Sequence, residues 1–264
     1  MIDIGVNLTN SRFDKDLDDV ILRAQSSGII NLLVTGTNVV ESQNATKLCA
    51  KYPKFLYSTA GVHPHDADHV SKDYLILLSQ LANLNCVKAI GECGLDFNRN
   101  FSTPENQIRV FEEQVSLANS LQMPLFLHQR DAFEPWYEIL KPFVGQIPAM
   151  VSHCFTGSKG ELSQCLDAGM YIGITGWLCD NRRGQELRDI VKYIPLERLM
   201  IETDAPYLTP RTIKPKPKSS RNEPSYINYI VDALVEATGH SREDIVQQTT
   251  INAKTVFSIG DVNA

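Results

Sequence analysis

The sequence predicts an α/β fold built on parallel strands, and two features support that prediction. Short apolar runs alternate with segments that carry helical signals. Four of these runs end in Glu92, His128, His153 and Asp204, at spacings of 36, 25 and 51 residues. Because these spacings approximate one, one and two strand–helix units, each polar residue is expected to end a buried strand. The ends of such strands meet on one face, where α/β proteins build their sites.

The candidate strands cover eight segments: 2–6, 29–35, 55–62, 87–92, 124–128, 149–153, 170–175 and 198–204. Eight strands that alternate with helices favour a (β/α)8 TIM barrel, which typically needs roughly 250 residues. The chain has 264 residues, so we expect residues 1–264 to form one barrel domain. A doubly wound open sheet is the alternative arrangement.

Several helices carry start signals. The run STPE at 102–105 supplies a cap, a first-turn proline and an acid, and apolar residues then recur at helical spacing. Pro224 opens a second such helix, and Ser241 with Asp244 resembles a capping box that opens the last one. Asp131 is expected to cap the helix that follows segment 124–128.

The composition narrows the class of protein. With 43% hydrophobic and 21% charged residues, the chain can bury a large core. We expect neither a signal peptide nor a membrane span, because the amino end has no basic segment followed by an apolar one and no apolar stretch is long enough. The six cysteines include no CxxC pair and are expected to be reduced thiols. These features favour a cytoplasmic enzyme with no membrane partner, for which we assume a monomer.

The net charge of −6 argues against a generally basic nucleic-acid-binding surface. It leaves a nucleic-acid substrate possible, because carboxylates that hold a metal count as acids and basic residues can be local.

The four strand-end residues point to a metal site. Taken singly, such a carboxylate is often a helix cap or a buried hydrogen-bonded group, and such a histidine is often structural. Together, Glu92, His128, His153 and Asp204 are harder to explain without a ligand, since burying uncompensated charge is costly. Glutamate, two histidines and aspartate can hold a divalent cation, which favours hydrolysis by metal-activated water.

Further polar residues follow the third and fourth strands. His63 and His65 flank Pro64 and fit metal ligands, proton donors or phosphate contacts, or an exposed turn. Arg99 lies on the expected catalytic face, where an arginine suits a phosphate oxygen. A structural pair between Asp96 and Arg99 is equally open.

The segment Arg211 to Arg221 carries five basic residues and no acid. Loops after the last strands of a barrel often bind phosphate, although such a run also fits a solvated loop. Trp177, Phe155 and Tyr207 follow late strands, where aromatic rings can stack on unpaired bases or simply pack.

Several runs together resemble the TatD family of metal-dependent deoxyribonucleases, within the amidohydrolase-like barrels. They are DIGVNLTN, TAGVHPHD, AIGECGLDFNRNFSTPE, HCFTG, YIGITGW, IETDAPYL and RNEP. The resemblance runs from Asp3 to the final helix. It implies a TIM barrel, a divalent metal and phosphodiester cleavage. It further implies a 3′→5′ exonuclease on single-stranded DNA and RNA, with a role in DNA repair.

The resemblance also implies roles for individual residues. In the family's pattern, the positions of Glu92, His128 and His153 bind metal, and the position of Asp204 binds a metal or activates its water. The family usually ends its first strand in Asp-x-His-x-His, whereas residues 3–7 of this chain read DIGVN and lack both histidines. We therefore expect one site at Glu92, His128 and His153, and a weaker second site from Asp204, Glu92 and Asn7.

As a mechanism, Asp204 is expected to be the general base. His63, ahead of His65, is expected to steady the scissile phosphate or protonate the leaving 3′ oxygen. Arg99 and Arg221 are expected to offset phosphate charge, and Trp177 to contact substrate. Two imidazole ligands favour Zn, Mn or Fe over Mg, which prefers a shell of oxygen ligands. Because family nucleases are commonly assayed with Mg²⁺, Mg²⁺ is the first candidate, and Mn²⁺ or Zn²⁺ are the alternatives.

Two other functions remain open from the sequence. One is a metal-dependent amide or ester hydrolase of the deacylase type, which would not need the basic loop. The other is a non-catalytic nucleic-acid binder in which the missing histidines mark a decayed enzyme. Release of product from a labelled single strand, with and without a chelator, separates these possibilities.

Overall fold

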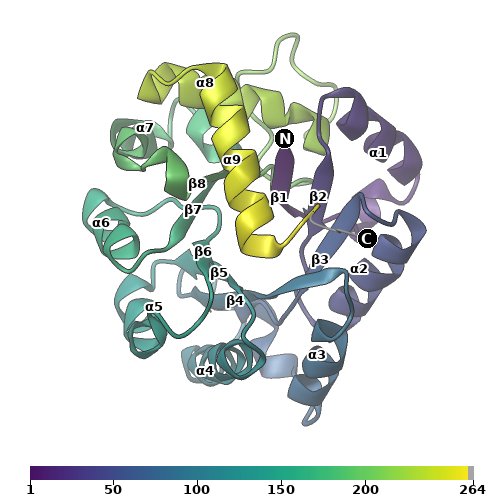
Figure 1. Cartoon of the computed structure of the whole chain (residues 1–264), viewed down its shortest axis with the longest axis vertical. Helices are drawn as coiled ribbons and strands as arrows, with labels where there is room; N and C mark the ends of the chain where they lie inside the picture. The colour runs from purple at the N-terminus through teal and green to yellow at the C-terminus, as the bar shows by residue number, and fades with distance from the viewer. Residues whose placement is uncertain (261–264) are drawn as a thin grey trace.

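The computed structural model describes residues 1–260 as a barrel of eight parallel strands that alternate with helices (Figure 1). The strands are β1 Ile2–Val6, β2 Asn31–Val34, β3 Leu56–Ala60, β4 Val87–Asp96, β5 Leu125–Arg130, β6 Met150–Ser152, β7 Tyr171–Ile174 and β8 Leu199–Ile201. The α-helices are α1 Leu17–Ser26, α2 Val39–Lys51, α3 Tyr74–Ala82, α4 Pro104–Leu121, α5 Phe133–Leu140, α6 Lys159–Asp167, α7 Gln185–Ile190, α8 Ile227–Thr238 and α9 Arg242–Phe257.

The sheet nearly closes on itself between its first and last strands. Neighbouring strands pair in parallel in the order β1 to β8. Val6 and Ala205 then form a parallel bridge, and the Asp204 amide donates to the Gly5 carbonyl at 2.8 Å. This closure confirms the predicted TIM barrel and excludes the doubly wound open sheet.

All eight predicted strands are present, and β4 differs most from its predicted bounds. It continues past Glu92 to Asp96, because Gly94 and Asp96 pair with His128 and Arg130 of β5 after an irregularity in register. The extension places Asp96 and the start of the following loop at the rim of the barrel.

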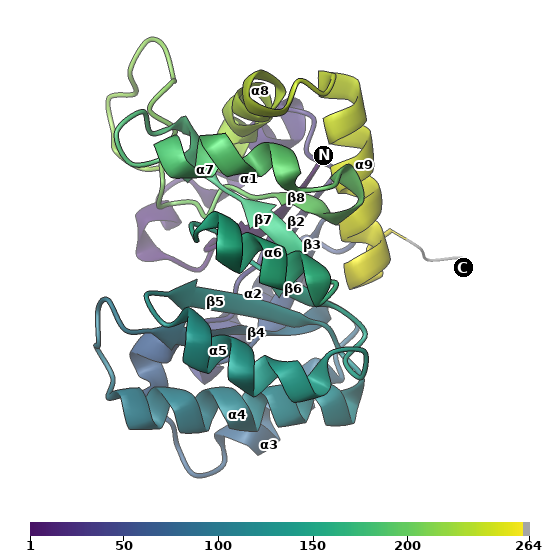
Figure 2. The ribbon, with the colours of Figure 1, turned by 90° about the vertical axis from the view of Figure 1, so that its left-hand side faces the viewer.

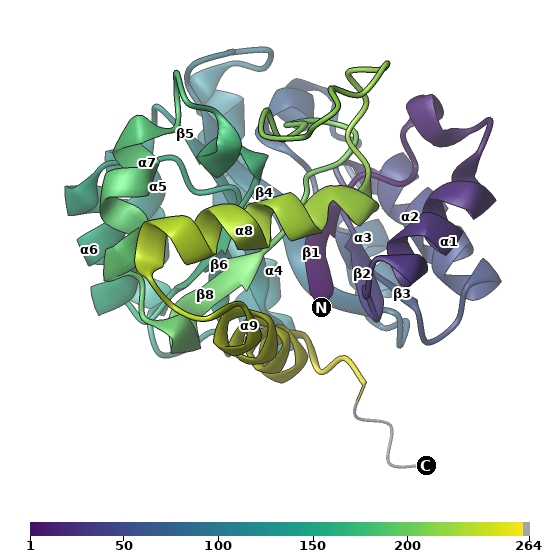
Figure 3. The same cartoon turned by 90° about the horizontal axis from the view of Figure 1, so that it is seen from above.

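The barrel interior is filled by apolar side chains from several strands. Ile4, Leu33, Phe126 and Met200 belong to one buried cluster, together with residues of α9 that include Phe257. Figure 2 shows α9 lying across the amino ends of the strands. Helix α9 therefore seals this end, and Figure 3 shows the loop between β8 and α8 on the opposite side of the barrel.

Local capping explains where several helices begin. The Thr103 side chain accepts from the Asn106 amide at the start of α4, and Ser241 accepts from the Asp244 amide at the start of α9. The prediction for Asp131 is wrong, because Ala132 is the N-cap of α5. Asp131 instead has a φ of 53° and accepts a hydrogen bond from Asn98.

No helix within residues 1–260 has both the length and the apolar character needed to cross a membrane. All six cysteines lie in this range, and all are free thiols.

Candidate metal centre and active-site cleft

A cleft of about 820 Å³ opens at the carboxyl ends of the strands. Its lining includes nine of the ten residues that the sequence predicts for the site: Asn7, His63, His65, Glu92, Arg99, His128, His153, Trp177 and Asp204. The tenth, Arg221, lies in a neighbouring pocket with Arg12, Lys15 and Lys218. The barrel therefore collects side chains that are far apart in the sequence.

The alternation of side chains along each strand explains why the histidines reach the cleft. On β5, Phe126 fills the barrel interior and His128 lies two residues further on. After β6, His153 follows the interior residue Val151 by the same interval. Because residues two apart share a face of a strand, both imidazoles lie directly above the apolar interior.

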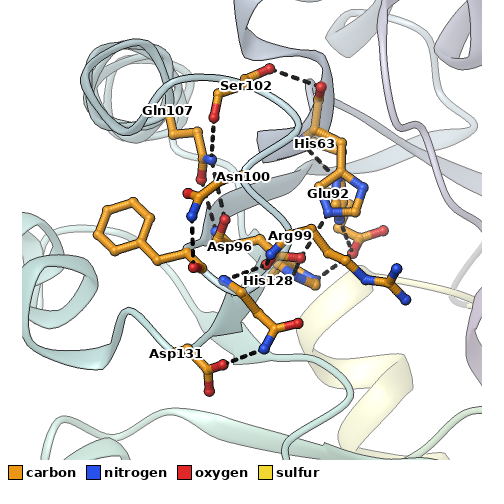
Figure 4. Close-up of polar contacts among 12 residues, drawn as sticks. His63, Glu92, Asp96, Arg99, Asn100, Ser102, Gln107, His128 and Asp131 are labelled. Carbon is orange, nitrogen blue, oxygen red and sulfur yellow. Dashed lines mark hydrogen bonds and ion pairs between the residues drawn. The ribbon is translucent and has the colours of Figure 1, made fainter.

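Three imidazoles converge on one carboxylate oxygen, Glu92 Oε1 (Figure 4 shows His63 and His128). It lies 2.8 Å from His153 Nε2, 3.1 Å from His128 Nδ1 and 3.4 Å from His63 Nε2. His63, Glu92 and His128 each offer a ligand atom, and these atoms lie within 4.8 Å of one another. The sequence left His63 open as a metal ligand, a proton donor or a phosphate contact, and its place in this cluster favours the first of these.

Burial and mutual charge shift the pKa values of this cluster. Burial is the largest influence on Glu92, but the charges of His153 and His63 outweigh it and hold the pKa well below its usual range. For His153, burial is again largest, and Glu92 and Glu202 outweigh it to raise the pKa well above its usual range. Burial lowers the pKa of His63 to about 4, so its ring is neutral near pH 7. A metal binds the neutral form of imidazole, so binding here would release the proton that Glu92 and Glu202 favour on His153.

An independent observation supports a divalent cation at this cluster of imidazole and carboxylate groups. His128 Nε2 is buried and has no hydrogen-bond partner, and Asp96 Oδ2 lies 3.6 Å away from it. Buried polar atoms are rarely left unpaired, so an orphaned imidazole nitrogen points to a missing ligand. Imidazole nitrogens and a carboxylate oxygen in one small volume are a donor set for a divalent transition metal.

Asp204 lines the same cleft and is held at the junction of β8 and β1. Its Oδ1 accepts from Asn7 Nδ2 at 3.0 Å, and its φ is 53°. Burial, followed by the negative charges of Glu92 and Glu202, raises the pKa of Asp204 to about 7. A carboxyl group with this pKa can exchange a proton near neutral pH.

Sequence reasoning missed Glu202, a fully buried carboxylate beneath the cluster. Its Oε2 lies 3.1 Å from His153 Nδ1, and its Oε1 accepts from the Cys154 amide at 2.5 Å. It can therefore orient the His153 ring through the nitrogen that faces away from Glu92. The signal was available, because Glu202 precedes Asp204 by two residues and such residues share a strand face.

Glu202 also explains why residue 5, in β1, is a glycine. A Cβ added at Gly5 or at Gly173 would clash with the Glu202 carboxylate. The space beside Gly5, which a histidine at that position would need, is therefore filled by Glu202. Asn7, at the second such position, is hydrogen-bonded to Asp204.

The remaining predicted site residues have different surroundings. His65 Nε2 lies 2.7 Å from Asp96 Oδ2. Asp96 accepts from the Arg99 amide through Oδ1, and the Arg99 guanidinium lies 6.0 Å from the Phe101 ring. Trp177 is at the rim, with the Arg183 guanidinium 4.4 Å from its ring centroid.

Arg221 already forms ion pairs with two carboxylates outside the cleft. Its guanidinium contacts Asp16 at 2.6 Å and Glu223 at 2.7 Å. In the same basic segment, Arg211 pairs with Asp180 at 2.9 Å, whereas Lys214, Lys216 and Lys218 are exposed. A direct role for Arg221 in binding substrate stays a prediction, and its position favours a structural role.

A nearly closed barrel with a glutamate–histidine cluster at its strand ends, beside an open cleft, defines a hydrolase of the metal-dependent barrel type. A family model described as "TatD related DNase" matches residues 2–258 of the chain. The chain therefore belongs to the TatD-related DNase family, whose members hydrolyse phosphodiester bonds.

Curated relatives cover almost the whole chain. A protein of Pectobacterium atrosepticum named 3′-5′ ssDNA/RNA exonuclease TatD is 52% identical over 259 residues, 98% of this chain and 100% of the relative. A protein of the same name from Klebsiella pneumoniae is 51% identical and covers 100% of this chain and 99% of its own length.

Solved structures share the fold. A TatD family hydrolase from Entamoeba histolytica has a TM-score of 0.88 at 30% identity, covering 97% of both chains. A TatD homologue from Escherichia coli has a TM-score of 0.87 at 26% identity, covering 98% of both. A lactonase engineered for organophosphate hydrolysis has a TM-score of 0.66 at 11% identity, covering 97% of this chain and 95% of its own, and shows the barrel fold alone.

Proposed function

We propose that this protein is a metal-dependent 3′→5′ exonuclease that acts on single-stranded DNA and RNA. The observation that carries the proposal is the convergence of three imidazoles on Glu92 Oε1 at the floor of an open cleft. The polarity and the strand preference are those in the names of the curated relatives.

Glu92, His128 and His153 are the proposed metal ligands, joined by His63, and Asp204 is the candidate for an adjoining second position. The support is their proximity to one another and the unpartnered His128 Nε2. Mg²⁺ remains the first candidate by resemblance, while the imidazole-rich donor set favours Mn²⁺ or Zn²⁺. Comparing cleavage by chelated protein reloaded with each ion tests this order.

A divalent cation bound here supplies a more acidic water and stabilises negative charge on a phosphoryl oxygen. Asp204 would accept the proton from the attacking water, in keeping with its pKa of about 7. His65, oriented by Asp96 at 2.7 Å, then becomes the better candidate to protonate the leaving 3′ oxygen, because His63 lies against Glu92. Arg99 would contact a phosphate beside the scissile one.

We further propose that the enzyme acts as a cytoplasmic monomer in DNA repair. This part rests on the family resemblance alone. A strain lacking the gene should be more sensitive to agents that damage DNA ends, and sedimentation of the purified protein should give the mass of one chain.

The test of the main proposal uses a single-stranded oligonucleotide labelled at either end. We expect a ladder of shortened products from the 5′-labelled strand and immediate release of a labelled mononucleotide from the 3′-labelled strand. A chelator should stop both reactions. Glu92→Gln and His153→Asn should lose at least about two orders of magnitude in rate, the scale of removing a catalytic electrostatic contact.

Glu134→Gln is a matched control, because Glu134 is exposed on α5 outside the cleft, and it should retain the wild-type rate. Wild-type activity in both Glu92→Gln and His153→Asn would refute the assignment. Binding without cleavage would favour the non-catalytic reading, and cleavage of small esters or amides without cleavage of DNA or RNA would favour the deacylase-like one.

A further inference from the structure

Phe101 is a large apolar side chain left exposed at the rim of the cleft. It is 62% exposed, and it lines the cleft from the loop between β4 and α4. Scattered exposed apolar residues need no explanation, but an aromatic ring at the mouth of a polar site is a candidate contact for a ligand.

The segment before Phe101 is held in place by its own polar groups. Asp96 Oδ1 accepts from the amides of Asn98 at 3.0 Å and Arg99 at 2.8 Å. The Asn100 side chain donates to the Phe97 carbonyl at 2.9 Å. Figure 4 shows that Asp96, Arg99 and Asn100 lie beside the candidate metal ligands His63, Glu92 and His128. The backbone that carries Phe101 is thus anchored to the same Asp96 that contacts His65.

The segment after Phe101 is anchored as firmly. Gln107 of α4 donates to the carbonyls of Asp96 at 3.2 Å and Ser102 at 2.9 Å. The Ser102 hydroxyl donates to the His65 carbonyl at 2.8 Å and accepts from the Asp68 amide at 3.0 Å. An aromatic ring on a loop tethered at both ends is already positioned, so a ligand would not need to order it on binding.

Phe101 and its neighbour Arg99 offer contacts for the base and the phosphate of one nucleotide. Its ring meets the His65 ring edge to face, with centroids 4.7 Å apart, and the Arg99 guanidinium is 6.0 Å from its centroid. None of the ion pairs within residues 1–260 involves the Arg99 side chain, so its charge is available to a phosphate. The Arg99 guanidinium could therefore bind a phosphate while the exposed Phe101 ring stacks on the base of the same nucleotide.

Other aromatic residues at the rim are less available. The Trp177 ring is covered by Arg183, and the Tyr207 hydroxyl accepts a hydrogen bond from Asn10. Tyr207 is 48% exposed, less than Phe101.

We propose that Phe101 is the stacking platform for one base of the substrate strand, and that Arg99 contacts the phosphate of that nucleotide. This inference rests on the proposed nuclease function and gives it a site that selects unpaired bases. A base within a duplex already has its faces covered by neighbouring pairs, whereas a base in a single strand is free to stack on an aromatic ring.

The test is binding of a single-stranded oligonucleotide with uncleavable phosphorothioate linkages to the metal-loaded protein. A fluorescent 2-aminopurine replaces the base at each position near the 3′ end in turn. We expect quenching at one position, and we expect Phe101→Ala to remove it and to weaken binding by about 5- to 20-fold. Phe101→Trp should retain the quenching, and Phe101→Leu should not.

An oligonucleotide that lacks the base at that position provides the decisive control. It should bind the wild type and Phe101→Ala equally, because no base is left to stack. Tyr193→Ala is the matched protein control, since Tyr193 is 49% exposed and lies outside the cleft. It should change neither quenching nor affinity.

Equal weakening of the intact and the abasic strand by Phe101→Ala would overturn the inference, as would wild-type behaviour of Phe101→Leu. The two proposals fail separately. A wild type that binds and quenches but never cleaves would contradict the nuclease function alone, and one that cleaves without any effect of Phe101→Ala would contradict the stacking site alone.

Discussion

The Glu202 carboxylate fills the space beside Gly5, and a double-mutant cycle measures the coupling free energy between these two positions. A Cβ at position 5 would clash with Glu202 Oε2, and its next neighbour would be the Phe126 ring at 3.3 Å. Glu202 is fully buried, so its carboxylate cannot swing into solvent. In Gly5→Ala the carboxylate must therefore move away from His153 Nδ1, which lies 3.1 Å from Oε2.

The expected magnitude follows from these contacts. Loss of a hydrogen bond to a charged group costs about 1.5 to 3 kcal/mol, and overpacking adds about 1 to 3 kcal/mol. We expect Gly5→Ala to lower the free energy of unfolding by about 3 to 5 kcal/mol. Glu202→Ala should cost about as much, because it leaves His153 Nδ1 and the Cys154 amide without a buried partner.

In the Glu202→Ala background the clash is gone, so adding Gly5→Ala should cost less than about 1 kcal/mol. The coupling free energy is then about 2 to 4 kcal/mol in the direction of rescue. Urea unfolding of chelated protein measures all four species without a contribution from bound metal. Additivity within about 0.5 kcal/mol would refute the reasoning.

Three further predictions concern the rest of the molecule. A hydrogen bond from Arg221 lowers the pKa of Asp16 to about 2. Arg221→Met should therefore lower the free energy of unfolding by about 1 to 2 kcal/mol above pH ~4, a figure that allows for partial solvent exposure. The difference in unfolding free energy between variant and wild type should vanish as the pH falls towards 2, where Asp16 becomes protonated. An equal loss of stability at every pH in acid titrations of unfolding would contradict this. The hydrogen bond with Cys49 lowers the pKa of Cys86 to about 7, whereas the pKa values of the other five cysteines are raised. Iodoacetamide near neutral pH should therefore alkylate Cys86 first, which a peptide map of the treated protein would detect. Ser158 forms a capping box at α6, and Ser158→Ala should cost about 1 kcal/mol in thermal or urea unfolding, with no change in the rate of cleavage.

Much of the fold and site could be predicted because it depends on local patterns. Apolar runs of strand length, separated by capped helices, are enough to indicate an eight-stranded barrel. Because side chains alternate along a strand, a histidine two residues after an interior position must share its face, which places His128 and His153 in the cleft.

Other contacts depend on how distant segments close around the barrel. His63 meets Glu92 only because β3 and β4 are neighbours, and their relative height depends on an irregular register. Arg221 is recruited by Asp16, which lies 205 residues earlier in the chain. A basic residue in a basic loop gives no local sign of such a partner.

The sequence by itself determined the order of strands and helices, the strands that bring the glutamate and histidines to the cleft, and the family. The tertiary structure alone decided that three imidazoles share one oxygen of Glu92, that Glu202 fills the space beside Gly5, and that Phe101 stands exposed at the rim. The physical reason is that alternation along a strand is a local property of the backbone. Partner choice and burial arise only when the closed barrel brings remote strand ends within contact distance.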